Sequence, residues 1–355
     1  MDPAPRISRL WWFSAPVLAI MIGAVVVIGT LRVPYVILSP GGARSVGPLV
    51  TITQKPGGPK VTVDPATDDL LYLTVSSMVK PSGFLALRGW LDDKAEVEPS
   101  APFLGTQTNQ ENRRLNLELM TDSQAKAKKV ALERLGFEVK TVHQGAFLED
   151  VDPTLPAGKV LKPGMTVVGA DGKQIATRDQ LVAAIGEHDP GDTMELQVVP
   201  LGETKPVTVK ATLGERPDQP GEPVLGVSTV DRSTFVYPVD ISIDSGQVGG
   251  PSAGLAFTLA ILDRMTPGSL TGDGRVAVTG TIELDGSVGP VGGVNHKTEA
   301  AISEGAKLML VPPDEYKEAV KASNGRIKVE SVSTLDEALA ALEAHGGDPL
   351  PAATR

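Results

Sequence analysis

The chain has 355 residues, of which 41% are hydrophobic and 21% charged, and its formal net charge is -10. This length exceeds what one hydrophobic core usually supports, so about two or three folded units are expected. The acidic balance and the lack of a clustered Lys or Arg run exclude nucleic acid as a partner. With no cysteine, disulfides, a cysteine nucleophile and thiolate metal sites are excluded as well.

The first element is an uncharged run over residues 10–31, rich in Ala, Val, Ile and Leu. As a helix it would be roughly 33 Å long, against a hydrocarbon core of about 30 Å. We predict a transmembrane helix rather than a cleaved signal peptide, because Leu31-Arg32-Val33-Pro34 offers no small-residue cleavage site. Arg6 and Arg9 place residues 1–9 in the cytoplasm and the rest of the chain outside the membrane. The lipid bilayer is therefore an expected partner.

Residues 33–121 are predicted to form a membrane-proximal β-region followed by a connection. The runs 49–52 and 70–75 predict strands, and the polar stretch 91–110, which has no clear period, predicts an extended segment. A helical pattern then covers 112–135, with a second helical segment capped near Thr121-Asp122-Ser123.

The next unit, residues 122–215, combines the turn Leu161-Lys162-Pro163-Gly164, the hairpin Asp171-Gly172-Lys173, a helix after Thr177 and two closing strands. This order resembles a PDZ domain of the bacterial, permuted kind. The resemblance implies a groove in which a substrate peptide adds as an extra strand.

Leu135, Gly136 and Phe137 resemble the carboxylate-binding loop of that family, in which backbone N–H groups hold a peptide C-terminus. Taken alone, the same three residues fit a helix C-cap equally well. The Pro- and Gly-rich stretch 216–223 then predicts a linker.

The strongest local signal is Gly249-Gly250-Pro251-Ser252-Ala253-Gly254, which precedes an apolar run. Pro in the first turn predicts a helix start, where backbone N–H groups would stabilise an oxyanion beside the Ser252 hydroxyl. Gly249 and Gly250 are predicted to contribute to the oxyanion site and to let a substrate backbone approach. For an arbitrary serine in this position, capping of the helix is the better interpretation.

A serine nucleophile needs a base, and few candidates exist among the four histidines, His143, His188, His296 and His345. A lysine can serve if its pKa falls from about 10.4 towards 7 or 8, which requires burial. Lys297 fits, because it lies at the start of a predicted helix capped by Asn295 and is followed by the small residues Ala300 and Ala301.

The stretch 249–313 resembles the proteolytic domain of Lon. Five motifs occur in order: GPSAG, Val278-Thr279-Gly280-Thr281-Ile282, residues 286–293, Lys297 with two alanines behind it, and Leu310-Val311-Pro312. The resemblance implies Ser252 as nucleophile, Lys297 as base and Thr279 as the residue that orients the lysine. It also implies an α+β multidomain chain that ends in a Lon-type α/β domain of the ribosomal protein S5 domain 2-like fold, over residues 224–345.

With the anchor in front, the architecture resembles bacterial membrane-bound PDZ-Lon peptidases, and Lon-type domains are known for homo-oligomeric rings. We therefore expect a membrane-anchored serine endopeptidase of extracytoplasmic proteins or peptides, ending in a disordered tail over 346–355. No Walker A sequence, metal motif or cofactor motif is found, so ATP-independent action is expected.

One departure from Lon is Gly249, where that family has an acidic residue before its serine. Two alternatives remain open. An α/β-hydrolase elbow would need a buried strand before Ser252 and a later Asp and His. A non-catalytic membrane-tethered adaptor would use the PDZ-like groove alone and leave the Lon-like domain inert.

Overall fold

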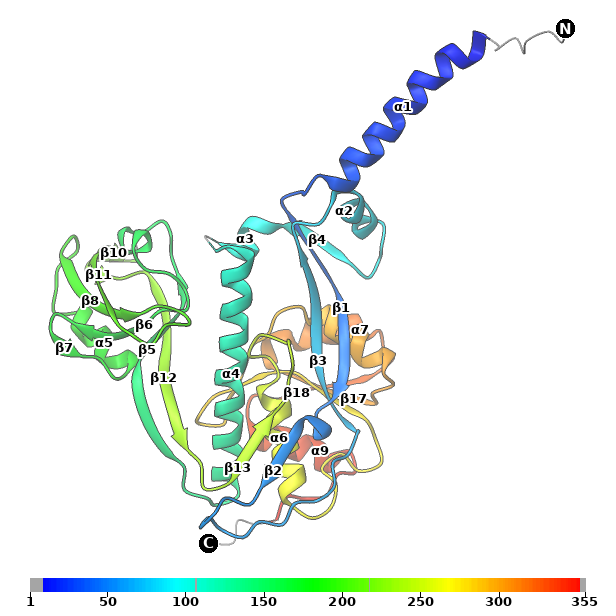
Figure 1. Cartoon of the computed structure of the whole chain (residues 1–355). Coiled ribbons are helices and arrows are strands. Elements are labelled where there is room, and N and C mark those ends of the chain that lie inside the picture. The colour runs from blue at the N-terminus through cyan, green and yellow to red at the C-terminus, as the bar shows by residue number, and fades with distance from the viewer. Residues whose placement is uncertain (1–8, 106, 217, 352–355) are drawn as a thin grey trace.

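The computed structural model describes residues 9–105, 107–216 and 218–351 (Figure 1), and the side chains of residues 9–15 and 24 are not described. The predicted cytoplasmic residues 1–8 and the tail residues 352–355 lie outside the described part. The helices are α1 (Arg9–Thr30), α2 (Gly83–Trp90), α3 (Ser100–Leu104), α4 (Asn109–Arg134), α5 (Arg178–Ile185), α6 (Gly254–Met265), α7 (Val294–Ser303), α8 (Tyr316–Ser323) and α9 (Leu335–Ala344).

The strands fall into two six-stranded sheets and three short pairs. They are β1 (Tyr35–Ser45), β2 (Val50–Thr53), β3 (Leu70–Val79), β4 (Glu96–Pro99), β5 (Lys140–Val151), β6 (Thr166–Ala170), β7 (Lys173–Gln174), β8 (Thr193–Val199), β9 (Val207–Thr212), β10 (Gly214–Arg216), β11 (Gln219–Val224), β12 (Val227–Val236), β13 (Asp240–Ile243), β14 (Val276–Val278), β15 (Thr281–Ile282), β16 (Val288–Gly289), β17 (Leu308–Val311) and β18 (Lys328–Ser331).

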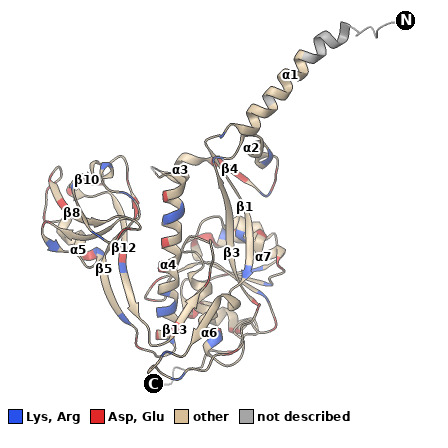
Figure 2. Ribbon diagram, in the orientation of Figure 1, with Lys and Arg blue, Asp and Glu red and all other residues tan. Residues whose placement is uncertain are grey.

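Helix α1 stands away from the rest of the molecule and meets it at α2 (Figure 1). Its side chains at 16–23 and 25–30 are exposed, and no charged residue occurs along this part (Figure 2). Within the described part of the chain, no helix has both the length and the apolar character needed to cross a membrane. The helix predicted at 10–31 is present, and its membrane span stays a prediction.

The larger sheet has the order β18-β17-β14-β3-β1-β4. Strand β3 pairs in parallel with β14 and antiparallel with β1. Leu70 and Tyr72 pack into the core on one face, while Leu71 and Leu73 pack into the core on the other. Because a strand buried on both faces needs cover from both sides, these residues cannot form the separate membrane-proximal region predicted over 33–121.

The connection over 91–110 is also more ordered than predicted, since it contains β4 and α3. Helix α4 is continuous through 121–123, so the predicted second helical segment is wrong. The two hydroxyl groups expected to cap a new helix bind elsewhere. Thr121 Oγ1 donates to the Leu117 carbonyl one turn back, and Ser123 Oγ donates to the Pro251 carbonyl on another element, so neither caps a new helix.

The second sheet has the order β12-β5-β6-β8-β9, and α5 covers its core. Strand β12 pairs with β5 from Val227 opposite Val151 to Val236 opposite Lys140. This unit therefore runs from 140 to 236 rather than over the predicted 122–215, because α4 packs against α6 in the larger core. It is inserted into the larger unit between α4 and β13, and the β5–β12 ribbon joins the two (Figure 1).

Two predicted flexible segments carry structure instead. The linker predicted at 216–223 lies largely within the β10–β11 hairpin. The described part of the predicted disordered tail is held at Asp348, whose N–H donates to the Ser269 carbonyl and whose Oδ2 accepts from the Ser269 N–H. One main-chain bond and one side-chain bond thus hold a residue that composition alone assigns to a tail.

Candidate active site

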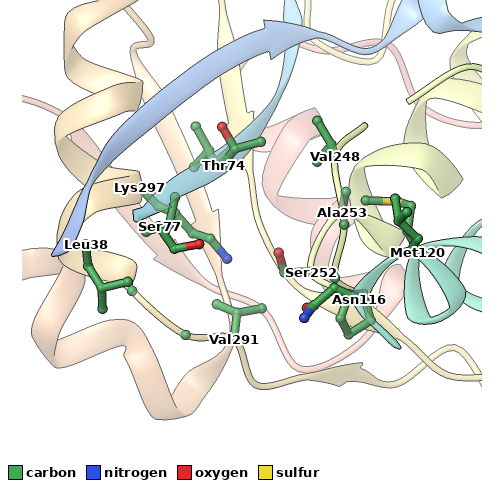
Figure 3. A pocket seen from close by; sticks show the side chains of 18 of the residues that line it. Leu38, Thr74, Ser77, Asn116, Met120, Val248, Ser252, Ala253, Val291 and Lys297 are labelled. Atoms are coloured by element: carbon green, nitrogen blue, oxygen red, sulfur yellow. The ribbon is translucent and has the colours of Figure 1, made fainter. Parts of the chain in front are cut away.

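A cavity of about 920 Å³ contains both Ser252 and Lys297 (Figure 3). Its walls come from α4, from β1 and β3, from the segment that leads to Ser252, and from the loop at 290–293. The side chains of Lys297 and Ser252 point toward one another across it. The two residues that the sequence selects thus line one cavity although 45 positions separate them.

Ser252 lies in a turn just before α6, whose N-cap residue is Ala253, with no side-chain cap. The Ser252 hydroxyl therefore does not cap the helix. Strand β13 ends at Ile243, so a loop rather than a buried strand leads to the serine. An α/β-hydrolase elbow needs that strand, and the geometry does not supply it.

Helix α4 holds the turn that contains Ser252 through two hydrogen bonds. The Gly250 N–H donates to the Asn116 carbonyl at 2.7 Å, and Ser123 Oγ donates to the Pro251 carbonyl at 2.9 Å. A Cβ on Gly249 would lie 2.9 Å from the Asn116 Cβ, so glycine is required for this close approach. Gly250 also has φ of +93°, a backbone conformation that favours glycine.

The hydrogen bond from Gly250 bears on the oxyanion role predicted for this glycine. Since the Gly250 N–H already binds Asn116, it does not serve as an oxyanion donor in this arrangement. Among the hydrogen bonds of the described residues, none uses the N–H of Ser252 or Ala253. These two groups sit at the start of α6, where peptide dipoles favour negative charge. They are the better candidates for an oxyanion site.

Lys297 lies in the first turn of α7 and is 3% exposed. Burial lowers the pKa of Lys297 to about 8, and the nearby Glu315 carboxylate partly opposes this shift. The predicted cap at Asn295 is wrong, because α7 has Gly293 at its N-cap, with φ of +66° and no side-chain cap. A lysine with this pKa is partly neutral near pH 7, as a general base must be.

Thr279 links the lysine to the serine segment. Lys297 Nζ donates to Thr279 Oγ1 at 3.1 Å, and Thr279 Oγ1 donates to the Ser252 carbonyl at 3.3 Å. The Thr279 side chain is fully buried. Buried hydrogen bonds of this kind hold a long side chain in one rotamer, so the bond from Lys297 to Thr279 restrains the position of the amine.

Histidine does not take the position of the base. His296 is buried beside Lys297, but it does not line the cavity, and its Nε2 lies 3.6 Å from Glu96 Oε2. No group of three or more His, Asp or Glu side chains in the described ranges could hold a metal ion.

The predicted carboxylate loop at Leu135, Gly136 and Phe137 proves to be a helix C-cap. The Phe137 N–H donates to the Leu132 carbonyl at 3.0 Å and the Gly136 N–H to the Glu133 carbonyl at 2.9 Å, with Gly136 at φ of +86°. Leu135 and Phe137 pack against the larger core. These N–H groups are therefore not free for a peptide carboxylate, and the prediction is wrong.

Sequence reasoning missed several residues that line the cavity. Leu38 and Ser77 face each other in the β1–β3 pairing, and Asn116 lies on α4 (Figure 3). The available signal was the uninterrupted apolar run that opens β3, which is typical of a strand buried on both faces inside a larger domain. In the sequence, Ser123 falls between the apolar positions Met120 and Ala127 of the helical pattern, which was the signal for its contact to the turn that contains Ser252.

Comparisons with known proteins agree with this architecture. Residues 229–344 match the model of the Lon protease (S16) C-terminal proteolytic domain, and residues 133–211 match a PDZ domain. The chain thus carries a Lon-type proteolytic domain, the domain of a serine peptidase, together with a PDZ domain.

Among curated relatives, Lon protease 2 of Bacillus subtilis is 36% identical over 33% of this chain and 21% of that protein. The Lon protease of Lawsonia intracellularis is 27% identical over 54% of this chain and 22% of its own length. The chain thus spans about a fifth of these relatives. A solved PDZ domain of an SdrC-like protein from Listeria monocytogenes is 23% identical, covering 26% of this chain and 93% of that domain, with a TM-score of 0.23.

Proposed function

We propose that the chain is an ATP-independent serine endopeptidase in which Ser252 is the nucleophile and Lys297 the general base. The observation that carries the proposal is the buried Lys297 amine, which shares one cavity with Ser252 and is tied through Thr279 to the serine's own carbonyl. A buried amine without a bonded carboxylate is the form in which lysine can accept a proton at neutral pH.

The proposed reaction follows from these positions. Neutral Lys297 Nζ takes the proton from Ser252 Oγ as that oxygen attacks the substrate carbonyl carbon. The N–H groups of Ser252 and Ala253 stabilise the resulting oxyanion. The protonated lysine then gives its proton to the leaving amine, which leaves an acyl group on Ser252. Lys297 next activates a water molecule that hydrolyses this ester and frees the enzyme.

The test is cleavage of an unfolded protein without ATP by the full chain and by Ser252→Ala and Lys297→Ala. Lys317→Ala, at an exposed position on α8, is the matched lysine control. We expect both site variants to be folded and inactive and Lys317→Ala to keep full activity. An active Ser252→Ala variant would exclude the dyad, and a silent, folded wild type would favour a non-catalytic adaptor.

We infer that the PDZ unit binds substrate peptide along β12 instead of at 135–137. Strand β12 is the outermost strand of its sheet, and α5 lies against it, tied by the Arg178 N–H bond to Asp231. Gly226, with φ of +74°, precedes the strand. No hydrogen bond among the described residues uses the N–H of Leu225 or Gly226. An outer strand preceded by free N–H groups suits a peptide that ends in a carboxylate.

This assignment predicts that peptides with a free C-terminus bind more tightly than the same peptides amidated. Gly226→Ala should weaken binding, because its Cβ would lie 2.5 Å from a Leu155 methyl carbon, whereas Gly221→Ala points into open space. Isothermal titration of both variants measures this. Equal affinity for both peptide forms would refute the site at 225–226.

We also propose that α1 anchors the chain in a membrane, with the proteolytic domain outside the cytoplasm. The support is the uncharged run at 10–31 and the exposure of its large apolar side chains, from 47% at Ile28 to 72% at Ile20. Apolar surface of this extent needs an apolar partner. Alkaline carbonate extraction should leave the chain in the membrane pellet, and its release would contradict the anchor.

A further inference from the structure

Helix α2 has its apolar side chains on the outside. The small residues Ala86 and Gly89 face inward, and a Cβ on Gly89 would lie 2.9 Å from a Val97 methyl carbon. Phe84, Leu87 and Leu91 are 58%, 50% and 78% exposed. The spacing of three residues puts Phe84 and Leu87 on one stripe of the helix, and Leu91, four residues later at the C-cap, continues it. A surface helix normally has the opposite arrangement, with large apolar residues turned inward.

This stripe continues onto neighbouring apolar surface at the end of α1. Helix α1 contacts α2, and a Cβ on Gly83 would lie 3.0 Å from the Ile28 carbonyl oxygen, so the two elements are closely packed. Leu31, just after α1, is 59% exposed. Figure 1 shows α2 beside the end of α1 that faces the body of the molecule. Whatever covers α1 is therefore in position to cover α2.

The side chains around the stripe are those that suit the boundary between lipid and water. Trp90 is 56% exposed, and its ring packs edge-on against Tyr35 with centroids 5.4 Å apart. Trp and Tyr favour that boundary because one end of the ring is apolar and the other polar. Arg88 is exposed next to the stripe, where its long stem can extend along lipid to the headgroups.

We propose that α2 lies in the surface of a lipid bilayer, with Phe84, Leu87 and Leu91 inserted among the acyl chains. The proposal rests on the membrane anchor proposed for α1, and it adds a second contact that fixes how the catalytic unit is oriented on the membrane. Short helices with Trp, Phe and Leu on one face are typical of this boundary.

The second contact bears on which substrates can reach Ser252. Val79 lines the active-site cavity, and Ser82, three residues later, is the N-cap of α2. Three residues of chain span at most about 10 Å, so one end of the cavity lies within that distance of α2. Phe103 lines the same cavity and is 37% exposed. Segments of membrane proteins close to the bilayer surface are the substrates that this placement favours.

The test uses Trp90 as a depth probe in the full chain. The chain has three tryptophans, so Trp11→Phe with Trp12→Phe leaves Trp90 alone. The protein is reconstituted into phosphatidylcholine–phosphatidylglycerol vesicles with and without brominated acyl chains, and flotation reports anchoring separately. We expect floating protein whose Trp90 emission is blue-shifted and quenched at least twofold by brominated lipid. Leu87→Asp should abolish the quenching without preventing flotation, whereas Val320→Asp, an exposed apolar position on α8, should change neither.

Floating protein with unquenched Trp90 would overturn the docking of α2 and leave the anchor intact. Blue-shifted emission that resists brominated lipid but depends on protein concentration would mean that a second copy covers the stripe, which also overturns the proposal. Protein that fails to float would overturn both. Peptidase activity on a soluble peptide reports the Ser252–Lys297 proposal independently and should be the same in Leu87→Asp and wild type.

Discussion

The pKa of Lys297 gives a quantitative prediction of how activity depends on pH. Burial lowers this pKa from 10.5 to about 8. At pH 7 about a tenth of the molecules would then hold a neutral lysine, roughly 300-fold more than at a pKa of 10.5. The value of kcat/KM should therefore rise tenfold per pH unit below pH 8 and level off above it.

Glu315→Gln tests the cause of this pKa. The carboxylate raises the pKa of Lys297, so its removal should move the whole profile to lower pH. Activity at pH 7 should rise, by no more than about tenfold, because the neutral fraction starts near one tenth. The Val291 N–H donates a hydrogen bond to Glu315, and the side-chain oxygen of glutamine can still accept it. Glu318→Gln, exposed on α8, is the matched control.

The assay is hydrolysis of an unstructured fluorogenic peptide by the full chain between pH 5.5 and pH 10, with stability followed in parallel. Rates that keep rising to pH 10, or that are already level at pH 6, would refute the inference that burial lowers the pKa of Lys297 to about 8. A Glu315→Gln profile identical to wild type would show that the carboxylate does not act on Lys297.

Three further predictions concern stability and positioning. Lys297→Met should be inactive yet more stable by about 3 kcal/mol below pH 8, since the folded chain no longer buries a charge. This gain should fade as the pH rises from 8 towards 10.5, because the wild-type lysine is then neutral when folded. Ser123→Ala should lose about 1 kcal/mol and several-fold in activity, because the bond to the Pro251 carbonyl is removed. Gly249→Ala should lower activity at least tenfold, because its Cβ meets Asn116.

Urea unfolding at pH 6 and pH 10 measures the first of these three, and a less stable Lys297→Met at pH 6 would contradict it. For Ser123→Ala and Gly249→Ala, kcat and stability are compared with those of the control Ser303→Ala, which changes an exposed serine on α7. If Ser123→Ala lost stability but no activity, its contact would be structural and would not position Ser252.

The proposed catalytic pair, Ser252 and Lys297, could be selected from the sequence because each residue lies in a local motif. Pro251 and the glycines define the turn before α6, and small residues follow Lys297 on α7. Local sequence signals of this kind predict where a helix begins, although contacts from α4 hold the turn in place. The sequence also predicted the burial of Lys297, whose consequence is the lowered pKa.

The parts that could not be predicted depend on pairing between distant segments. Strand β3 joins β14 about two hundred residues later, and β12 returns to β5 across the whole PDZ unit. Hydrophobic periodicity identifies such strands but not their partners, so the insertion of one unit into the other stayed hidden. At 135–137, one motif fitted both a helix cap and a ligand loop, and tertiary packing of Leu135 and Phe137 decided for the cap.

In the proposed reaction, Ser252 forms a covalent acyl intermediate with help from Lys297. The most direct measurement is acid quenching during turnover of a slow peptide ester, followed by peptide mapping by mass spectrometry. We expect an acyl group on the peptide that contains Ser252 in wild type, and none in Lys297→Ala at the same time point. An active wild type with the acyl group on another residue, or with equal acylation in Lys297→Ala, would contradict it.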